Sequence, residues 1–280
     1  MRGTRLWTLL ALVAALALGI VAAGCGDDEE ETSDGGGTAS VETLEEGVLT
    51  VGTDTPFPPF EIGQPPDISG YDIEVMDAIA EELGLTAEYT DTGFGTIFRD
   101  TANGQFDTAA AASTITPARE NTVDFTDPYY EAQQALLVAE GSDITSVDDL
   151  AGQIVGAQDG TTGETYANDE TDASEVRGFP EGPNAVSALV TGQVDAVIID
   201  QPVAVDAVEK QGGVEVLEEI PTDELYGFAV APDNDSLREA MNEALATLKE
   251  DGTLTDLYDQ YFQVEPPASV LEGTNEQLTE

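Results

Sequence analysis

The sequence predicts an α/β fold whose sheets are mainly parallel and carry helices on both faces. From Val48 onward, short β-like apolar runs alternate with segments of helical periodicity, and repeated strand-helix units of this kind build mainly parallel sheets. One run, Val194–Asp200 (VDAVIID), is almost continuously apolar, as expected where both faces of a sheet are covered. With 280 residues and 41% hydrophobic content, the chain can bury one large core or two moderate ones.

The first set of elements extends from Val48 to Ser113. A strand is predicted at Val48–Asp54 (VLTVGTD), and the helix after it has apolar side chains at helical spacing before Gly84. These side chains are Ile73, Met76, Ile79, Ala80 and Leu83. The alternation continues with a strand at Leu85–Thr90, a short helix around Ile97 and Phe98 that ends near Gly104, and a strand at Phe106–Ser113.

A second set of elements begins at Ile154. The predicted strand Ile154–Gln158 (IVGAQ) leads into a helix for which Thr161 and Glu164 have capping-box spacing. A helix near Ala185–Val190 then precedes the strand that ends at Asp200. Closer to the C-terminus, Ser236 and Glu239 predict another capping box, and Gly252 ends the helix that they begin.

The N-terminal segment has the pattern of a secretory signal. Arg2 and Arg5 precede an uncharged apolar run, Leu6–Ala23, that leads to Cys25. The run is also long enough for an uncleaved membrane anchor, but the small residues of AAGC (22–25) resemble a bacterial lipobox. We therefore expect residues 1–24 to be a signal peptide and Cys25 to be lipidated, with the protein held at the outer face of the cell membrane.

Residues 25–46 are expected to be a solvated tether. The stretch GDDEEETSDGGGTAS (26–40) is acidic and then glycine-rich, with nothing apolar to bury. A cation-binding tail is the alternative, although the spacing of its carboxylates matches no calcium loop. Cys25 is the only cysteine, so the fold has no intrachain disulfide.

The composition excludes several classes of function. The chain has no histidine, which rules out a Ser-His-Asp triad, a Cys-His pair and a histidine-ligated zinc site. We expect no catalytic residue, no metal and no cofactor. A net charge of −49 repels nucleic acids and anionic lipids, and suggests a saline habitat in which salt screens the repulsion between carboxylates.

Three loops lie where ligands bind in open α/β sheets, outside the carboxyl ends of strands. They are TDTPF (53–57), STITPAR (113–119) and DGTTGE (159–164). One loop carries Arg119, one of only eight basic residues in the chain, and a guanidinium can bind a carboxylate through two parallel hydrogen bonds. Since Asp200 ends a further strand, one crevice could hold both charges, which predicts a zwitterionic ligand.

Seven segments together resemble the family 3 extracellular solute-binding proteins, which deliver amino acids to ABC importers. The resemblance extends from about Leu49 to Phe262, and its segments follow the family order. They are VGTDTPFPPFE, GYDIEVMDAIAEELG, GQFDTAAAASTITPARENTVDFTDPYY, SVDDLAGQIVGAQDGTT, GQVDAVIID, YGFAVAP and LKEDGTLTDLYDQYF.

The resemblance implies two α/β lobes of the type II periplasmic binding-protein fold, joined by two crossing strands and closing like a hinge. Lobe 1 would comprise residues 47–137 and 228–264, and lobe 2 residues 138–227. The crossing strands would be Ala135–Glu140 and Leu225–Val230, and residues 265–280 would form a polar tail.

The resemblance also implies the ligand contacts. Arg119, with the backbone N–H groups of Thr114 and Thr162, would bind the α-carboxylate of the ligand. Asp200 and the carbonyl of Ala112 would bind the α-ammonium. Phe57 and Phe94 would enclose the side chain, and Asp54 and Gln158 would reach its far end.

Each assignment has a structural alternative. Phe57 and Phe94 could be core aromatics, Asp200 could cap the helix that begins near Pro202, and Thr162 could only start its own helix. Two positions depart from the family pattern. Phe94 stands between two glycines, where relatives usually have an acidic or polar residue just before the aromatic, and Gly163 replaces an often polar, ligand-facing residue.

The resemblance implies the substrate-binding component of an importer, which is not an enzyme. It would be a monomer that takes a polar or basic amino acid to membrane permease subunits. The alternative is an enzyme on the same scaffold, a dehydratase of cyclic acids with Asp54 or Glu164 as general acid. A sensor module is disfavoured because the segment after Phe262 is polar.

Overall fold

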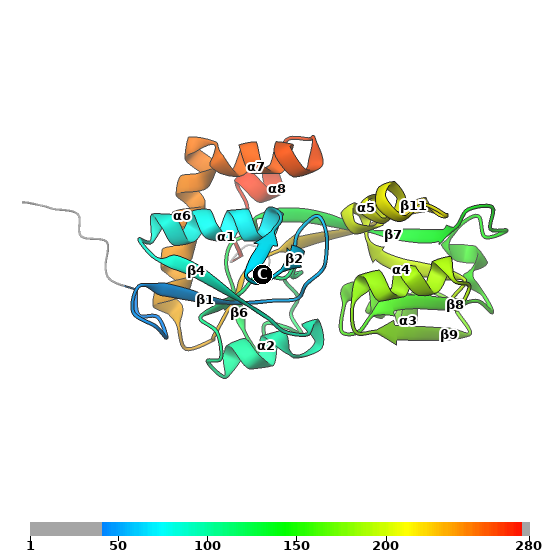
Figure 1. Cartoon of the computed structure of the whole chain (residues 1–280), viewed down its shortest axis with the longest axis horizontal. Coiled ribbons are helices and arrows are strands. Elements are labelled where there is room, and N and C mark those ends of the chain that lie inside the picture. The colour runs from blue at the N-terminus through cyan, green and yellow to red at the C-terminus, as the bar shows by residue number, and fades with distance from the viewer. Residues whose placement is uncertain (1–40, 276–280) are drawn as a thin grey trace, which may run out of the picture. The chain divides into compact units, whose positions relative to one another are not determined.

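Two five-stranded sheets organise the chain in a computed structural model that describes residues 41–275 (Figure 1). A third, two-stranded sheet pairs β2 (Ile62–Gln64) with β3 (Asp67–Ser69). Within the described residues, no helix is both long and apolar enough to span a membrane. The expected signal peptide, lipidated Cys25 and most of the tether lie outside the described residues.

The first sheet has the strand order β4-β1-β5-β12-β6. Its strands are β1 (Val48–Thr53), β4 (Thr86–Asp91), β5 (Thr108–Ala109), β6 (Asp124–Phe125) and β12 (Ala229–Val230). β1 pairs in parallel with β4 and β5, whereas β12 is antiparallel to both β5 and β6. We call this sheet and its helices lobe 1.

Helices cover both faces of the lobe 1 sheet. α1 (Tyr71–Glu82) buries Met76 and Ile79 in a cluster with Leu49 and Val51 of β1, while α2 (Phe94–Ala102) packs in a separate cluster with Ala109. Two C-terminal helices, α6 (Asp235–Asp251) and α7 (Thr253–Phe262), pack beside α1 (Figure 1). Successive strand residues face opposite sides, so each face of β1 and β5 has its own helix.

The second sheet has the strand order β11-β7-β10-β8-β9, and with its helices it forms lobe 2. Its strands are β7 (Tyr130–Ala139), β8 (Ile154–Gln158), β9 (Glu175–Phe179), β10 (Ala196–Asp200) and β11 (Val214–Tyr226). Its helices are η1 (Val147–Leu150), α3 (Thr162–Asp169), α4 (Gly182–Val190) and α5 (Gln201–Gln211). α3 packs in one apolar cluster with β10, and α4 and α5 in another.

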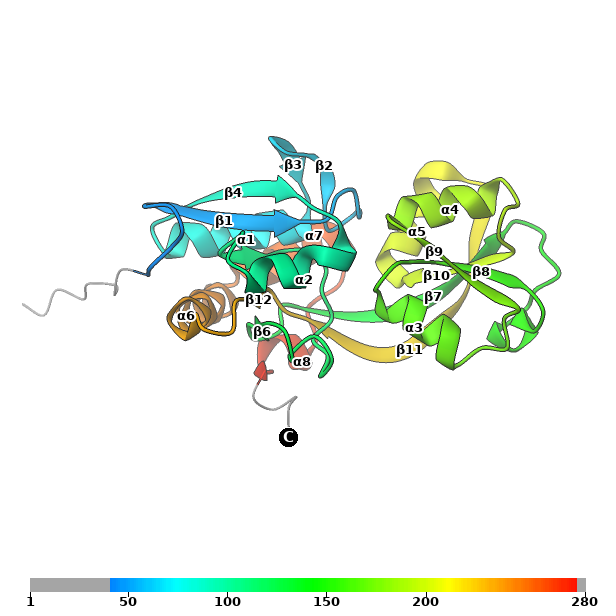
Figure 2. The same cartoon turned by 90° about the horizontal axis from the view of Figure 1, so that it is seen from below.

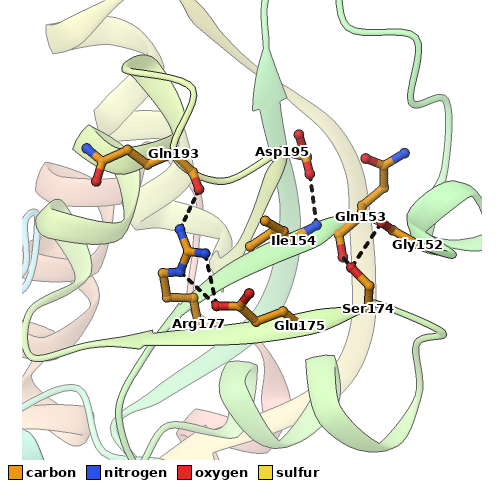
Figure 3. A network of polar contacts seen from close by, with 8 residues as sticks. All are labelled: Gly152, Gln153, Ile154, Ser174, Glu175, Arg177, Gln193 and Asp195. Carbon is orange, nitrogen blue, oxygen red and sulfur yellow. Dashed lines mark hydrogen bonds and ion pairs between the residues drawn. The ribbon is translucent and has the colours of Figure 1, made fainter.

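A polar network fixes the edge strand of lobe 2 (Figure 3). The Arg177 guanidinium of β9 pairs with Glu175 at 2.9 Å and donates to the carbonyl of Gln193 at 2.6 Å. Asp195 accepts the N–H of Ile154 at 2.8 Å. These partners are all exposed or half-buried, so the ion pair contributes little to stability, and we assign it a structural role.

The chain passes between the lobes twice, once from β6 into β7 and once from β11 into β12. β7 and β11 are antiparallel partners along most of their length (Figure 2), with Tyr130 opposite Tyr226 at their lobe 1 end. The second crossing lies inside the predicted segment Leu225–Val230. The first prediction, Ala135–Glu140, is wrong, because Ala135 already pairs with Ile199 of β10 in the lobe 2 sheet. The proposed lobe boundary at residue 137 therefore falls within β7.

The sheets are mixed and not mainly parallel. The central pairs β1–β4, β1–β5, β8–β9 and β8–β10 are parallel, as the strand-helix alternation predicts. The strands that adjoin the two crossings, β7, β11 and β12, are antiparallel to their neighbours. These strands are not connected to their neighbours by a strand-helix-strand unit, which is the connection that makes neighbouring strands parallel.

Two local expectations also need revision. The strand expected at Phe106–Ser113 is only Thr108–Ala109, because the chain turns away before Ala112, which has a positive φ of 43°. The last long helix is capped by Asn234 and not by Ser236, since the Asn234 side chain accepts the N–H of Leu237. Asn is as good a cap as Ser, so the helix begins earlier.

Both described ends of the chain are attached to lobe 1. Within the expected tether, the N–H of Leu44 donates to Asp107 at 2.8 Å. In place of a polar tail, residues 268–271 form the short helix α8 (Ala268–Leu271), whose Val270 is fully buried. The N–H of Asn275 donates to Asp127 at 2.8 Å. The buried Val270 and the hydrogen bonds of Asn275 hold this otherwise polar segment against lobe 1.

Candidate ligand-binding site

All nine residues predicted to bind the ligand line one cavity. Lobe 1 contributes Asp54, Phe57, Phe94, Ala112, Thr114 and Arg119, and lobe 2 contributes Gln158, Thr162 and Asp200. Asp54 follows β1, Gln158 ends β8 and Asp200 ends β10. The cavity is therefore built at the carboxyl ends of strands, where open α/β sheets bind ligands.

Arg119 presents a guanidinium that has no carboxylate partner among residues 41–275. It donates to the carbonyl of Thr114 at 2.7 Å and to that of Gly160, in lobe 2, at 3.2 Å. Its central carbon lies 5.0 Å from the ring centre of Phe94 and 4.8 Å from that of Phe98. None of the ion pairs among residues 41–275 includes Arg119. Desolvation lowers the pKa of Arg119 to about 10, so it stays charged at neutral pH.

Thr114 and Thr162, which line the same cavity as Arg119, each have a backbone N–H available for a ligand. Around Thr114, the N–H of Ile115 donates to Leu225 and the N–H of Gly227 donates to Ser113. In an antiparallel pairing of this kind, the N–H of the residue between them points away from the partner strand. Thr162 is the first residue of α3, and a helix provides no internal acceptor for its first N–H groups. The arrangement suits an anion.

Asp200 supplies the opposite charge. Its carboxylate accepts a short hydrogen bond from the side chain of Gln134, and it makes no capping bond to α5. The capping alternative is therefore wrong. Burial, reinforced by the charge of Glu224, raises the pKa of Asp200 to about 7. A ligand ammonium would offset the cost of burying this carboxylate.

The backbone at Ala112, which lines the cavity together with Asp200, is held in an unusual conformation. Its positive φ costs a non-glycine residue about 1–3 kcal/mol. The N–H of Ala112 donates to Asp72 at 2.8 Å, and Asp72 also accepts the hydroxyl of Tyr129 at 2.7 Å. Asp72 lies against a second fully buried acid, Glu61, and burial raises the pKa of both. This support fixes the carbonyl that was predicted to bind an ammonium.

Phe57 and Phe94 are both core residues and cavity walls. Each is 6% exposed and belongs to a different apolar cluster. The ring centre of Phe57 lies 6.3 Å from that of Phe60, and Phe94 packs edge-on against Phe98 at 5.4 Å. The two interpretations of these aromatics were therefore not exclusive.

Asp54 and Gln158 meet at the far end of the cavity. The side-chain N–H of Gln158 donates to Asp54 at 2.6 Å and to the carbonyl of Pro180 at 3.3 Å. Burial raises the pKa of Asp54 to about 6, although the bond from Gln158 opposes this rise. Asp54 belongs to lobe 1 and Gln158 to lobe 2, so this hydrogen bond links the two lobes.

Sequence reasoning missed Gln134 and Glu224, which lie behind the cavity on the crossing strands. Glu224 accepts hydrogen bonds from Gln134 at 3.0 Å and from the hydroxyl of Thr162 at 2.7 Å. Two glutamines that interrupt the apolar residues of β7 were the available signal for Gln134, whereas β11 contains several acidic residues and does not single out Glu224. Gln134 also explains one departure from the family pattern, since a side chain at Gly163 would place its Cβ 2.8 Å from the Gln134 amide oxygen.

Residues 41–275 hold no group of three or more His, Cys, Asp or Glu side chains arranged to bind a metal. Ala111 and Thr161 complete the lining of the cavity. The chemistry that the cavity offers is thus one guanidinium that forms no ion pair within residues 41–275, two N–H donors, two buried carboxylates and apolar walls.

Two α/β lobes joined by two crossings, with complementary charges facing one cavity, define a solute-binding protein. The chain belongs to the bacterial extracellular solute-binding proteins, family 3, whose sequence model matches residues 49–264. It is 31% identical over 220 residues to ABC transporter arginine-binding protein 1 of Escherichia coli K12, covering 76% of this chain and 90% of that protein.

Solved structures give the same result. An ancestral arginine-binding protein, 38% identical to this chain, has been solved with arginine (TM-score 0.73, covering 77% of this chain and 98% of that one) and with glutamine (TM-score 0.75, 79% and 100%). The ancestral amino acid-binding protein AncCDT-1, a precursor of cyclohexadienyl dehydratase, is 34% identical with a TM-score of 0.72, covering 77% and 96%.

Proposed function

We propose that this protein is the substrate-binding component of an ABC importer and captures a polar or basic α-amino acid between its two lobes. The observation that carries the proposal is the pairing of Arg119, which has no ion-pair partner among the described residues, with Asp200 in one cavity. An α-amino acid is a compact zwitterion that matches both charges at once. The relatives named above, which bind arginine or glutamine, support this ligand class.

Arg119, Thr114 and Thr162 would bind the α-carboxylate, and Asp200 and the Ala112 carbonyl the α-ammonium. A guanidinium can form two charge-assisted hydrogen bonds to a carboxylate, each about twice as strong as a neutral one. Phe57 and Phe94 would then enclose the ligand side chain, which would end near Asp54. In that position an amide could donate to Asp54, and a guanidinium could also stack on the aromatic rings.

No observation favours the enzyme alternative. Glu164 is not among the residues that line the cavity, because its carboxylate accepts the N–H of Gly160 at 2.7 Å. Asp54 is bonded to Gln158. AncCDT-1 is itself described as an amino acid-binding protein. We therefore propose binding without catalysis, with the protein acting as a monomer that docks on membrane permease subunits.

The lipid anchor remains part of the proposal. The motif AAGC (22–25) after an apolar run supports cleavage before Cys25 and its lipidation. Two acyl chains anchor a protein stably where one does not. Mass spectrometry of protein extracted from membranes should detect a diacylated N-terminal Cys25, and an intact Met1 would contradict this assignment.

A thermal-shift screen of the twenty amino acids tests the function directly. A ligand at 100 times its dissociation constant adds about 2.7 kcal/mol of stability, so arginine, lysine or glutamine should raise the melting temperature clearly. Aspartate and glutamate should have little effect. Calorimetry then measures affinity for the best ligand. Absence of binding by every amino acid, or turnover of prephenate, would overturn the proposal.

A further inference from the structure

Glu224 connects the two lobes directly behind the cavity. It lies near the lobe 1 end of β11 and is 6% exposed. One of its oxygens, Oε2, accepts the hydroxyl of Thr114 from lobe 1 at 2.5 Å and the hydroxyl of Thr162 from lobe 2 at 2.7 Å. Its other oxygen accepts the amide of Gln134 at 3.0 Å. One carboxylate thus holds a threonine from each side of the site.

From this geometry, and on the basis of the proposed function, we infer that Glu224 is a positioning residue for the ligand α-carboxylate. It would fix Thr114 and Thr162 so that their backbone N–H groups face the same point in the cavity. Glu224 would not touch the ligand. It is absent from the cavity lining and instead lines a cleft on the other side of the two threonines.

The hydrogen-bond inventory of a hydroxyl gives the reason. Each threonine hydroxyl has one proton, and in both residues that proton is donated to Glu224. Neither hydroxyl can then donate to a ligand carboxylate. The backbone N–H groups of Thr114 and Thr162 are left as the donors, and their directions depend on how firmly each residue is held.

The charge of Glu224 suits this place behind the site. A carboxylate in contact with the ligand would repel the ligand carboxylate, whereas behind the threonines it is hydrogen-bonded and partly offset by Arg119. The charges of Glu224 and Asp200 both favour the charged form of Arg119. Because Glu224 therefore has an electrostatic as well as a geometric effect, the test must include variants that remove a hydroxyl without changing charge.

The variants are Glu224→Gln, Thr114→Val and Thr162→Val, with Thr165→Val as the matched control. Thr165 is exposed on α3, and its hydroxyl donates to the carbonyl of Thr161, the N-cap residue of that helix. Each variant is titrated by calorimetry with L-arginine and with its α-amide, L-argininamide, which lacks the carboxylate. If glutamine proves to be the ligand, L-glutamine and its α-amide replace this pair.

We expect Thr114→Val and Thr162→Val each to weaken L-arginine binding about three- to tenfold, the worth of one hydrogen bond. Glu224→Gln, which affects both threonines, should weaken it by about tenfold or more. In the same variants, the affinity for L-argininamide should change by less than about threefold, because this ligand has no carboxylate to accept the backbone N–H groups of the two threonines. Thr165→Val should change neither the affinity for L-arginine nor that for L-argininamide. Adding Glu224→Gln to the double threonine variant should weaken L-arginine binding by less than Glu224→Gln does in the wild type, because only its electrostatic effect remains.

Equal losses for the acid and the amide would overturn the inference, because they would show a general structural role. So would additive effects of Glu224→Gln and the two threonine variants. If Glu224→Gln does not fold, the uncharged threonine variants still decide the question. A wild-type protein that binds no amino acid would refute the proposed function itself, a result separate from the comparison of acid and amide.

Discussion

The side chain of Gln158 donates to Asp54 at 2.6 Å, and this hydrogen bond joins residues of different lobes at the far end of the cavity. Because Asp54 is buried and Gln158 is its donor, the end of the cavity combines an anion with an amide. A carboxylate on a ligand side chain would meet like charge there in a water-poor site, which is unfavourable.

Selectivity against acidic amino acids should depend on Asp54. We expect Asp54→Asn to narrow the preference for arginine or glutamine over glutamate by about tenfold or more, because the like charge is removed. Competition against a bound probe measures this preference. Wild-type protein that binds glutamate more tightly than both arginine and glutamine would show that Asp54 does not face the ligand side chain.

Arg119→Ala should weaken binding of the amino acid by about 2–5 kcal/mol, since it leaves the ligand carboxylate buried without its charged partner. Arg177→Ala is the matched control, because this arginine pairs with Glu175 on the surface of lobe 2 (Figure 3). Calorimetry should find near wild-type affinity in Arg177→Ala and weakened affinity in Arg119→Ala. Unchanged affinity in Arg119→Ala would refute the carboxylate assignment.

The affinity should depend on pH through Asp200. With a pKa of about 7 in the free protein, this group is half protonated near neutral pH, but an ammonium requires the carboxylate. Binding should therefore weaken about tenfold between pH 8 and pH 6, at a rate of one decade per pH unit below the pKa. Asp200→Asn should bind weakly at both pH values. A flat profile in the wild type would contradict the contact.

The stability of the free protein should show the opposite dependence. Burial raises the pKa of Asp54 to about 6 and that of Asp200 to about 7, against about 3.9 in an unfolded chain. The folded state therefore binds more protons between these values, and this contribution to the unfolding free energy is lost as pH rises through 6 to 7. Without ligand, the melting temperature should be higher at pH 5 than at pH 8. The double variant Asp54→Asn/Asp200→Asn should reduce that difference.

Salt should stabilise the fold. A net charge of −49 creates self-repulsion between surface carboxylates, which a Debye length of about 3 Å at 1 M salt removes. We expect the melting temperature to rise from dilute buffer to molar potassium chloride. A constant or falling melting temperature would contradict adaptation to a saline habitat.

The sequence could predict the cavity because its residues lie at strand ends with strong local patterns. Asp54, Gln158 and Asp200 each follow or end a β-like apolar run, and Arg119 stands out among few cations. Glu224 and Gln134 were missed for a physical reason. They lie in crossing strands, and their neighbours are set by the pairing of β7 with β11, which no local pattern contains.

The same limitation explains the misplaced first crossing. The run Ala135–Ala139 is apolar because it is central in the lobe 2 sheet, between β10 and β11. An apolar run indicates that a strand is buried, but it does not indicate in which of the two lobes the strand is buried. The β1–β4 and β8–β9 pairs could be predicted because short strand-helix units place neighbouring strands in parallel.

The position of β12 has a consequence for how the chain is assembled. β12 stands between β5 and β6 and pairs with both, although it follows them by about a hundred residues. As the chain is synthesised from its N-terminus, residues 130–226 provide all five strands of lobe 2 before β12 has been made. Until β12 is made, β6 has no partner strand in the lobe 1 sheet, and the edges of β5 and β6 that pair with β12 stay open. A chain that ends before Ala229 would then combine a complete lobe 2 with a lobe 1 sheet that lacks β12. The unpaired strand edges of that sheet would be prone to aggregation.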